Sequence, residues 1–157
     1  MLESEADLQR WRVIWASAIA LIRAVGHVLE KVDAKNPKLK PLIKCSYARW
    51  KRDPEHEIFR EFIERERNNL LKEYESNVHP LEQVPVFVSL TLTSVEGSVQ
   101  QAYVDTFDIG ENIYRPLLSG PWEGDDCRDV LDEAIEWWGR ELDSLDVDIN
   151  KIDGTEF

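Results

Sequence analysis

The sequence predicts an α-rich (α+β) fold: a helical bundle of four or more helices, with a β-hairpin inserted before the C-terminal helix. Three observations predict it. Apolar residues recur at helical spacing near both ends of the chain, a stretch after Pro85 alternates as strands do, and prolines separate these segments. The length of 157 residues fits a single domain, 1–157, with a helical half at 1–84 and a second half at 85–157.

The first helix is expected to begin near Leu8, after a capping start at Ser4 and Asp7, and to stop at Asn36-Pro37. Its apolar stripe repeats at spacings of three and four and comprises Leu8, Trp11, Trp15, Ala18, Ile22, Val25 and Leu29. Ile14, Leu21 and Val28 widen the stripe. Such a helix must pack against more than one neighbour, as the spine of a bundle or in a dimer interface.

A short second helix is expected over about residues 39–52, and a third from Asp53-Pro54 to about Tyr74 or Glu75. The expected apolar stripe of the third helix comprises Phe59, Phe62, Ile63, Leu70, Leu71 and Tyr74. At about 100° per residue, Arg67 falls on this inward face, where an arginine is costly unless it is paired or lies at a cleft.

Two strands and a last helix complete the predicted fold. Residues 86–93 alternate as a strand does, 94–98 form the expected turn, and 99–109 form the second strand. A loop at 110–124 precedes the last helix, which Asp125 and Asp126 cap. The stripe of this helix comprises Leu131, Ile135, Trp138, Leu142 and Leu145, and its tail is expected to fray from Asp146.

The net charge of -12 is unevenly distributed. Residues 1–84 carry 15 basic and 14 acidic side chains, a balance of +1, whereas residues 85–157 carry 4 and 17, a balance of -13. The acidic half is not expected to bind nucleic acid. It could instead compete with nucleic acid for the basic residues, but a solvated acidic face is the more frequent explanation.

One stretch, between Asp33 and Asp53, contains no acidic residue. Its basic residues are Lys35, Lys38, Lys40, Lys44, Arg49, Lys51 and Arg52. Tyr47 and Trp50 lie among them, so this is where a polyanion such as RNA could bind. The alternative is that these side chains form a solvated face or pair with the acidic half.

Several classes of site and location are not expected. Two cysteines are too few for a disulfide framework, the three histidines lie far apart, and no Gly-rich phosphate loop is present, so neither a metal nor a cofactor is predicted. The apolar run from Val13 to Ile22 is short for a membrane span, and the acids before it do not suit a signal peptide. We therefore expect a cytoplasmic protein without a membrane partner.

One motif on the third helix resembles the signature of the HEPN superfamily, whose members are helical bundles. That signature is an Arg and a polar residue, commonly Asn, followed by a His after four to six intervening residues. Arg67-Asn68 is similar to its first half, and Tyr74 stands where the family has His. The resemblance covers residues 8–76 at most, about half the chain.

The resemblance implies a homodimer, in a toxin–antitoxin or defence setting, in which two such motifs meet and cleave RNA without metal. Arg67 would stabilise the developing phosphate charge. Tyr74 is a poor proton acceptor because a phenol titrates near pH 10, and His79 would have to fold back to replace it. The implied site, Arg67, Asn68, Tyr74 and His79, is therefore expected to be degenerate and inactive.

Three functions stay open at this point. The first is a HEPN-like homodimer that binds RNA or protein through a degenerate site. The second is an acidic helical protein–protein interaction module with no nucleic-acid role. The third is a weak metal-independent endoribonuclease that uses Arg67 with Tyr74 or His79.

Overall fold

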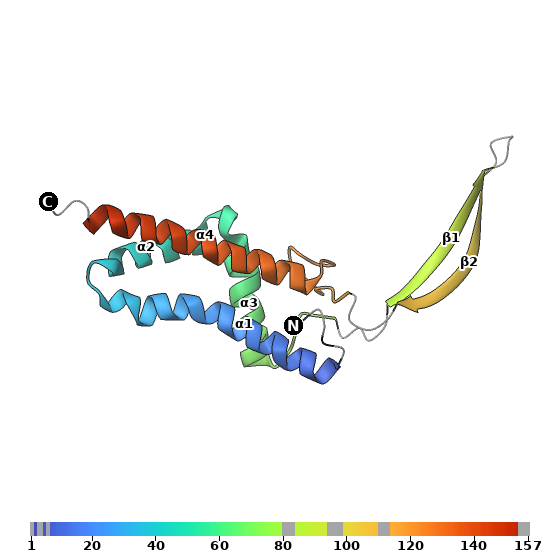
Figure 1. The fold of residues 1–157 in the computed structure, drawn as a ribbon, viewed down its shortest axis with the longest axis horizontal. Coiled ribbons are helices and arrows are strands. Elements are labelled where there is room, and N and C mark those ends of the chain that lie inside the picture. The colour runs from blue at the N-terminus through green and yellow to red at the C-terminus, as the bar shows by residue number, and fades with distance from the viewer. Residues whose placement is uncertain are drawn as a thin grey trace.

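The computed structural model describes residues 2, 5, 7–79, 84–93, 99–109 and 114–153. The predicted α-rich bundle is confirmed: α1, α2 and α4 run alongside one another, and the helical segment that includes α3 crosses them (Figure 1). This crossing segment contacts each of the other three helices. The interior of the bundle therefore forms between elements that are distant in the sequence.

Helix α1 (Leu8–Lys31) starts where Asp7 caps it, because the Asp7 carboxylate accepts a hydrogen bond from the backbone N–H of Arg10 at 2.9 Å. Ser4, the other residue expected at this cap, lies outside the described residues. The buried face of α1 consists of Trp11, Trp15, Ile19, Ile22, Gly26 and Leu29. Leu21 and Val28 do not join that face: they are 69% and 47% exposed.

A single 3₁₀ turn, η1 (Asp33–Lys35), leads into α2 (Leu39–Arg52). Helix α2 is short, and it buries Ile43, Ser46 and Trp50. Its last turn carries Arg49, Lys51 and Arg52, which suits the negative end of the helix dipole. The predicted range of 39–52 is confirmed.

The third helical segment is not a regular α-helix. It comprises η2 (Pro54–His56), the π-helical η3 (Phe59–Glu64), α3 (Arg65–Asn68) and the π-helical η4 (Asn69–Glu73). A π turn closes i→i+5 hydrogen bonds and therefore shifts every later side chain around the axis. The apolar stripe predicted on α-helical geometry is consequently wrong at its end, where Leu71 is 51% and Tyr74 is 90% exposed.

The end of this segment is fixed by Tyr74 and Glu66. Tyr74 has a left-handed backbone, with φ 57° and ψ 27°, which terminates the helix. The buried Glu66 carboxylate accepts hydrogen bonds from the backbone N–H of Asn77 at 3.2 Å and the Ser76 hydroxyl at 3.4 Å. Burial raises the pKa of Glu66, against the opposing effect of these hydrogen bonds. The chain after the helix is thereby held against it.

Strands β1 (Val84–Thr93) and β2 (Val99–Ile109) pair antiparallel, from Val84 opposite Ile109 to Thr93 opposite Val99. The register shifts between Val88 and Ser89, as at a β-bulge. Figure 1 shows both strands beyond the end of the helical bundle. The turn expected at 94–98 lies outside the described residues.

Helix α4 (Cys127–Asp153) begins where Asp126 caps it, as predicted. The Asp126 carboxylate accepts hydrogen bonds from the backbone N–H groups of Arg115 and Arg128, each at 3.0 Å. Burial acts to raise the pKa of Asp126, but the bonds from Arg128 and Arg115 outweigh it and lower the pKa. Two expectations for α4 are wrong: Ile135 is 55% exposed, and the helix continues past Asp146 instead of fraying.

The core is an aromatic cluster where α2, η3 and α4 meet. Trp50 and Phe59 are fully buried, with ring centroids 5.5 Å apart. Trp137 and Trp138 of α4 approach the Trp50 ring to 5.4 and 5.3 Å, edge to face. This geometry adds pairwise stabilisation of about 0.5–1.5 kcal/mol to the burial of large apolar area.

Two glycines provide a matched test of helix packing. A Cβ on Gly26 in α1 would lie 2.6 Å from the Tyr47 hydroxyl, which donates to the Gly26 carbonyl, and 3.2 Å from the Trp138 ring. Gly139 in α4 has open space around it. Alanine favours a helix over glycine by about 1 kcal/mol. We expect Gly139→Ala to raise the free energy of unfolding by that amount.

Gly26→Ala is expected instead to lower the free energy of unfolding by about 1–3 kcal/mol, because overpacking outweighs the helix propensity. Urea denaturation of both variants measures the two effects. Equal stabilisation by the two substitutions would show that α1 and α2 do not approach closely at Gly26.

Candidate nucleic-acid interface

Arg67 is half-buried on the third helical segment and lines a cavity against α1. Its Nη1 donates a hydrogen bond to Oδ1 of the adjacent Asn68 at 2.9 Å. The cavity has a volume of about 320 Å³ and is also lined by Ala20, Arg23, Ala24, His27 and Leu71. Arg67 thus lies at a cleft. This is one of the two environments in which an arginine on the inward helix face was expected to be tolerated.

Tyr74 and His79 lie in a different place. Both line a cavity of about 490 Å³ at the N-terminal end of α1. The His79 backbone N–H donates to the Pro116 carbonyl at 2.9 Å, which ties it to the loop before α4. Within one chain the structure therefore brings Tyr74 together with His79, but neither of them with Arg67. The cause is the π-helical turn after Asn68, which changes the register.

His27 was missed in the sequence, although it lines the cavity that holds Arg67. It is exposed on α1, four residues after Arg23 and therefore on the same helix face. That spacing was a signal available in the sequence. Its approach to Arg67 could not be found there, because it depends on how α1 packs against the third helical segment.

Four residues of the predicted basic stretch converge on one cavity between α1 and α2. Lys35, Lys40, Lys44 and Lys51 line it, and its volume is about 440 Å³. The other polar residues that line it are Arg23, Lys31, Glu30 and Tyr47. Glu30 is the single acid among the described lining residues, and its carboxylate is 3.3 Å from the Lys31 ammonium. We call this the basic cavity.

The inner wall of the basic cavity is held in place by Arg23 and Tyr47. The Arg23 guanidinium is 3.4 Å from the Glu64 carboxylate, and the Tyr47 hydroxyl donates to the Gly26 carbonyl. Burial raises the pKa of Tyr47, more than the nearby Arg23 lowers it. The phenol therefore stays protonated at neutral pH and presents no negative charge to the cavity.

Arg49 has a different role from the lysines around it. Its Nη2 lies 2.6 Å from Oε2 of Glu141 on α4, and the Trp50 indole N–H donates to the same oxygen at 2.5 Å. Arg49 thus forms part of the packing between α2 and α4. Arg52 lies 3.6 Å from Asp53, and Lys38 is exposed before α2; neither lines the basic cavity. The expectation that these three bind RNA is untested, and their position outside the basic cavity does not support it.

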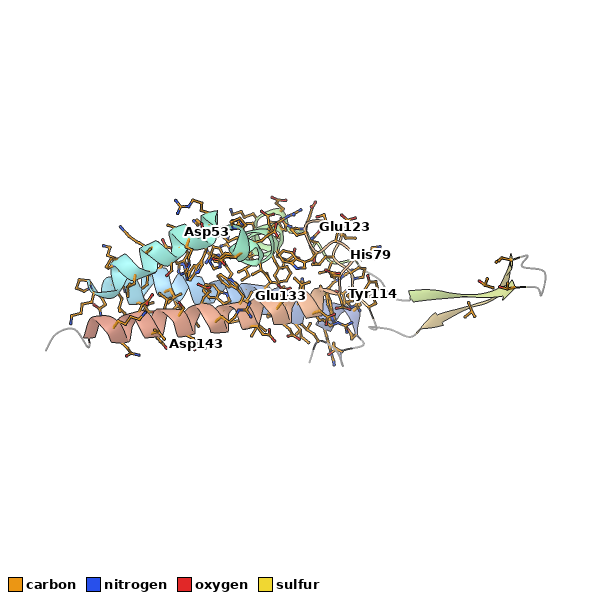
Figure 2. The ribbon with its side chains drawn as sticks, turned by 90° about the horizontal axis from the view of Figure 1, so that it is seen from above. Asp53, His79, Tyr114, Glu123, Glu133 and Asp143 are labelled. Atoms are coloured by element: carbon orange, nitrogen blue, oxygen red, sulfur yellow. The ribbon has the colours of Figure 1, made fainter. Side chains whose placement is uncertain are left out.

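The acids of α4 largely avoid the basic cavity. Most are exposed, including Glu133 and Asp143, which Figure 2 labels along the helix. Glu141 is the exception, buried against Arg49. Among the described residues, α4 forms one ion pair with the basic stretch, so most of its acidic residues do not neutralise that stretch.

Two further properties bear on the kind of site present. Within the described ranges, no group of three or more His, Cys, Asp or Glu residues is placed to hold a metal ion. One helical stretch, Leu8–Lys35, is long and apolar enough to cross a membrane by length and composition, although the core helix of a soluble protein passes the same test. Five large apolar side chains of that stretch are in fact buried against the rest of the bundle: Trp11, Trp15, Ile19, Ile22 and Leu29.

Comparison with known proteins adds no family assignment. No protein-family model, no curated protein and no solved structure matches this chain.

Proposed function

We propose that this chain is a HEPN-like, cytoplasmic homodimeric protein that binds single-stranded RNA through the basic cavity and lacks a working ribonuclease site. The observation that carries the proposal is the convergence of six cationic side chains, from Arg23 to Lys51, on a cavity with one acid. In this proposal β1 and β2 form one hairpin that extends from the bundle.

The spacing of the lysines suits a chain of phosphates. Lys40, Lys44 and Lys51 lie within about 40° of one another around α2, because they are separated by four and eleven residues. Along the helix axis they extend over roughly 16 Å. That length exceeds one phosphate and accommodates several along a nucleic-acid strand, so each lysine can neutralise a different phosphate.

A second copy of the chain is proposed to cover the outer face of α1. Val13, Leu21 and Val28 recur at spacings of eight and seven, and all three are exposed, at 67%, 69% and 47%. Leu71, 51% exposed, contributes from the third helical segment. Both Leu71 and Arg67 line the cavity against α1, so a dimer through this face brings the two copies of Arg67 toward each other.

The same geometry supports the loss of catalysis. Tyr74 is 90% exposed and lines a cavity that does not include Arg67. No proton acceptor of the expected motif therefore accompanies Arg67 within one chain. The ribonuclease alternative expected Tyr74 or His79 to supply that group; His27 would have to replace them, because it shares the cavity of Arg67.

The test of RNA binding is the salt dependence of affinity. Fluorescence anisotropy with a labelled 20-nucleotide single-stranded RNA is expected to give a linear fall of log K with log salt. Lys40→Ala/Lys44→Ala removes two phosphate contacts and should reduce the slope by about 1.4. The exposed Lys72, which does not line the basic cavity, is the control, and Lys72→Ala should leave the slope unchanged.

An unchanged slope in the double variant would refute the assignment of RNA binding to the basic cavity. Incubation of the wild type with the same RNA in EDTA is expected to leave it intact. Cleavage that disappears in both Arg67→Ala and His27→Ala would establish the ribonuclease alternative instead.

The test of the dimer is the mass in solution. Leu21→Glu places a charge on the outer face of α1 and is expected to convert a dimer into a monomer in sedimentation equilibrium. Val147→Glu changes an apolar side chain of α4 that is 53% exposed, and this control should remain dimeric. A wild type that is monomeric at all concentrations would refute the proposed dimer.

A further inference from the structure

The cavity lined by Tyr74 and His79 is distinct from the Arg67 cavity and from the basic cavity. Its volume of about 490 Å³ falls in the range of small-molecule sites. It lies between the first turns of α1, the end of the third helical segment and the loop before α4. Figure 2 labels His79 and Tyr114 at this end of the bundle. We call it the indole cavity, after Trp11 and Trp15.

The aromatic part of the indole cavity is a stacked pair of rings. The rings of Trp11 and Trp15 are nearly parallel, with centroids 5.7 Å apart and planes inclined by only 9°. The other apolar side chains that line the cavity are Leu8, Ala16, Leu70, Val78 and Leu118. A planar apolar group suits this lining because aromatic rings form favourable offset-stacked or edge-to-face contacts with one another, and the aliphatic side chains complete the apolar wall.

The charged part of the indole cavity is entirely cationic. Arg12 and Arg115 line it, and no carboxylate does so among the described residues. Arg115 is only 2% exposed, with its guanidinium carbon 4.4 Å from the centre of the Trp11 ring. A guanidinium can donate hydrogen bonds but cannot accept them. The charge is thus built into the wall of the cavity.

Two buried polar atoms at this cavity have no hydrogen-bond partner: Nε1 of Trp11 and Nδ1 of His79. The imidazole nitrogen can donate or accept, whereas an indole N–H can only donate, so Trp11 requires an acceptor. A buried donor that lacks a partner is costly, and an acceptor group of a bound molecule would remove that cost.

We propose that the indole cavity binds a small organic anion with a planar apolar body, such as an aromatic carboxylate, with the ring against Trp11 and Trp15 and the carboxylate toward Arg12 and Arg115. The two arginines supply charge-assisted hydrogen bonds, from the buried Arg115 and the exposed Arg12. This site is independent of the RNA interface, because the two cavities share no lining residue.

Isothermal titration with 2-naphthoate and its neutral analogue 2-naphthamide tests the proposal on the full chain. The carboxylate is expected to bind at least about tenfold more tightly than the amide. Arg12→Gln should weaken the binding of 2-naphthoate about tenfold, because it removes a charge-assisted hydrogen bond to the carboxylate. Arg12 is exposed, so the substitution should leave the core intact. Arg10→Gln, also exposed on α1 but not lining the cavity, should bind as the wild type does.

A second variant tests the location by shape. Ala16→Phe places a ring into the cavity and should abolish binding of 2-naphthoate, while circular dichroism reports an unchanged helix content. Equal affinity for the two probes, or full binding by Arg12→Gln or Ala16→Phe, would overturn the proposal. Lys40→Ala/Lys44→Ala should bind 2-naphthoate normally, so a failure of RNA binding and a failure at this site are distinguishable.

Discussion

Phe59→Ala is expected to lower the free energy of unfolding by about 3–5 kcal/mol, the largest effect anticipated for one substitution in this chain. Phe59 is fully buried, and its ring lies 5.4 Å from Trp137 and 6.0 Å from both Tyr47 and Trp138. Truncation to alanine leaves a cavity among rigid aromatic rings that cannot collapse into it.

Urea denaturation followed by far-ultraviolet circular dichroism measures this loss. Lys72→Ala is the control: Lys72 is on the same helical segment but is exposed, so its loss should cost less than about 1 kcal/mol. Comparable losses in the two variants would mean that the aromatic cluster does not hold the bundle together.

Glu141→Ala is expected to have the second largest effect, a loss of about 2–4 kcal/mol. Its carboxylate accepts from the Trp50 indole and pairs with Arg49, so the substitution leaves one buried donor and one half-buried charge without partners. His56 lies 3.7 Å from the other Glu141 oxygen and accepts from the Trp137 indole at 3.2 Å.

The matched control for Glu141 is Glu136, five residues earlier on α4. Glu136 lies 3.8 Å from Arg140, and both side chains are well exposed, so Glu136→Ala should cost no more than about 0.5 kcal/mol. Thermal and urea denaturation of both variants compare a buried with an exposed pair directly. A Glu141→Ala protein as stable as the Glu136→Ala protein would show that Arg49 and Trp50 find other partners.

The Glu141 contacts also separate stability from RNA binding. Arg49→Ala should reduce stability but leave the salt dependence of RNA binding unchanged, because Arg49 faces Glu141 and not the basic cavity. The lysines of α2 should behave in the opposite way. Exposed lysines contribute little to stability, whereas each phosphate contact contributes to the salt dependence.

Local patterns in the sequence were sufficient to predict that α1, α2 and α4 are helices. The spacing of Trp11, Trp15 and Ile22 identified the buried face of α1, and the proline and aspartate signals placed the starts of these helices close to where they lie. These features depend on residues within a few turns of one another. Propensity and periodicity describe such short-range relations well. The stop expected at Asn36-Pro37 is wrong for α1, which ends at Lys31 and is followed by the 3₁₀ turn η1.

The third helical segment could not be predicted in the same way. Its two π turns leave no clear signal in a pattern that assumes about 100° per residue, and they move Tyr74 out of the expected stripe. The candidate site depends on this register. On regular α-helical geometry Arg67 and Tyr74 would lie on the same helix face. In the structure they line different cavities.

Contacts between residues that are distant in the sequence could not be predicted from sequence patterns either. Arg49 and Glu141 are separated by 92 residues, and nothing in the basic stretch distinguished Arg49 from the lysines. The place of His27 in the Arg67 cavity could not be predicted either, because it depends on how the helices pack. Charge runs identify where an interface can form, but tertiary pairing decides which of their members remain available.

The aromatic cluster also gives the protein a spectroscopic property. Trp50, Trp137 and Trp138 lie within 4.8–5.4 Å of one another at steep angles, close enough for their electronic transitions to couple. Trp50 comes from α2 and the other two indoles from α4, so the coupling of Trp50 to them exists only while these helices are packed. A near-ultraviolet dichroism signal from this trio would therefore report tertiary packing separately from helix content, and would disclose any state in which the helices persist but the core has loosened.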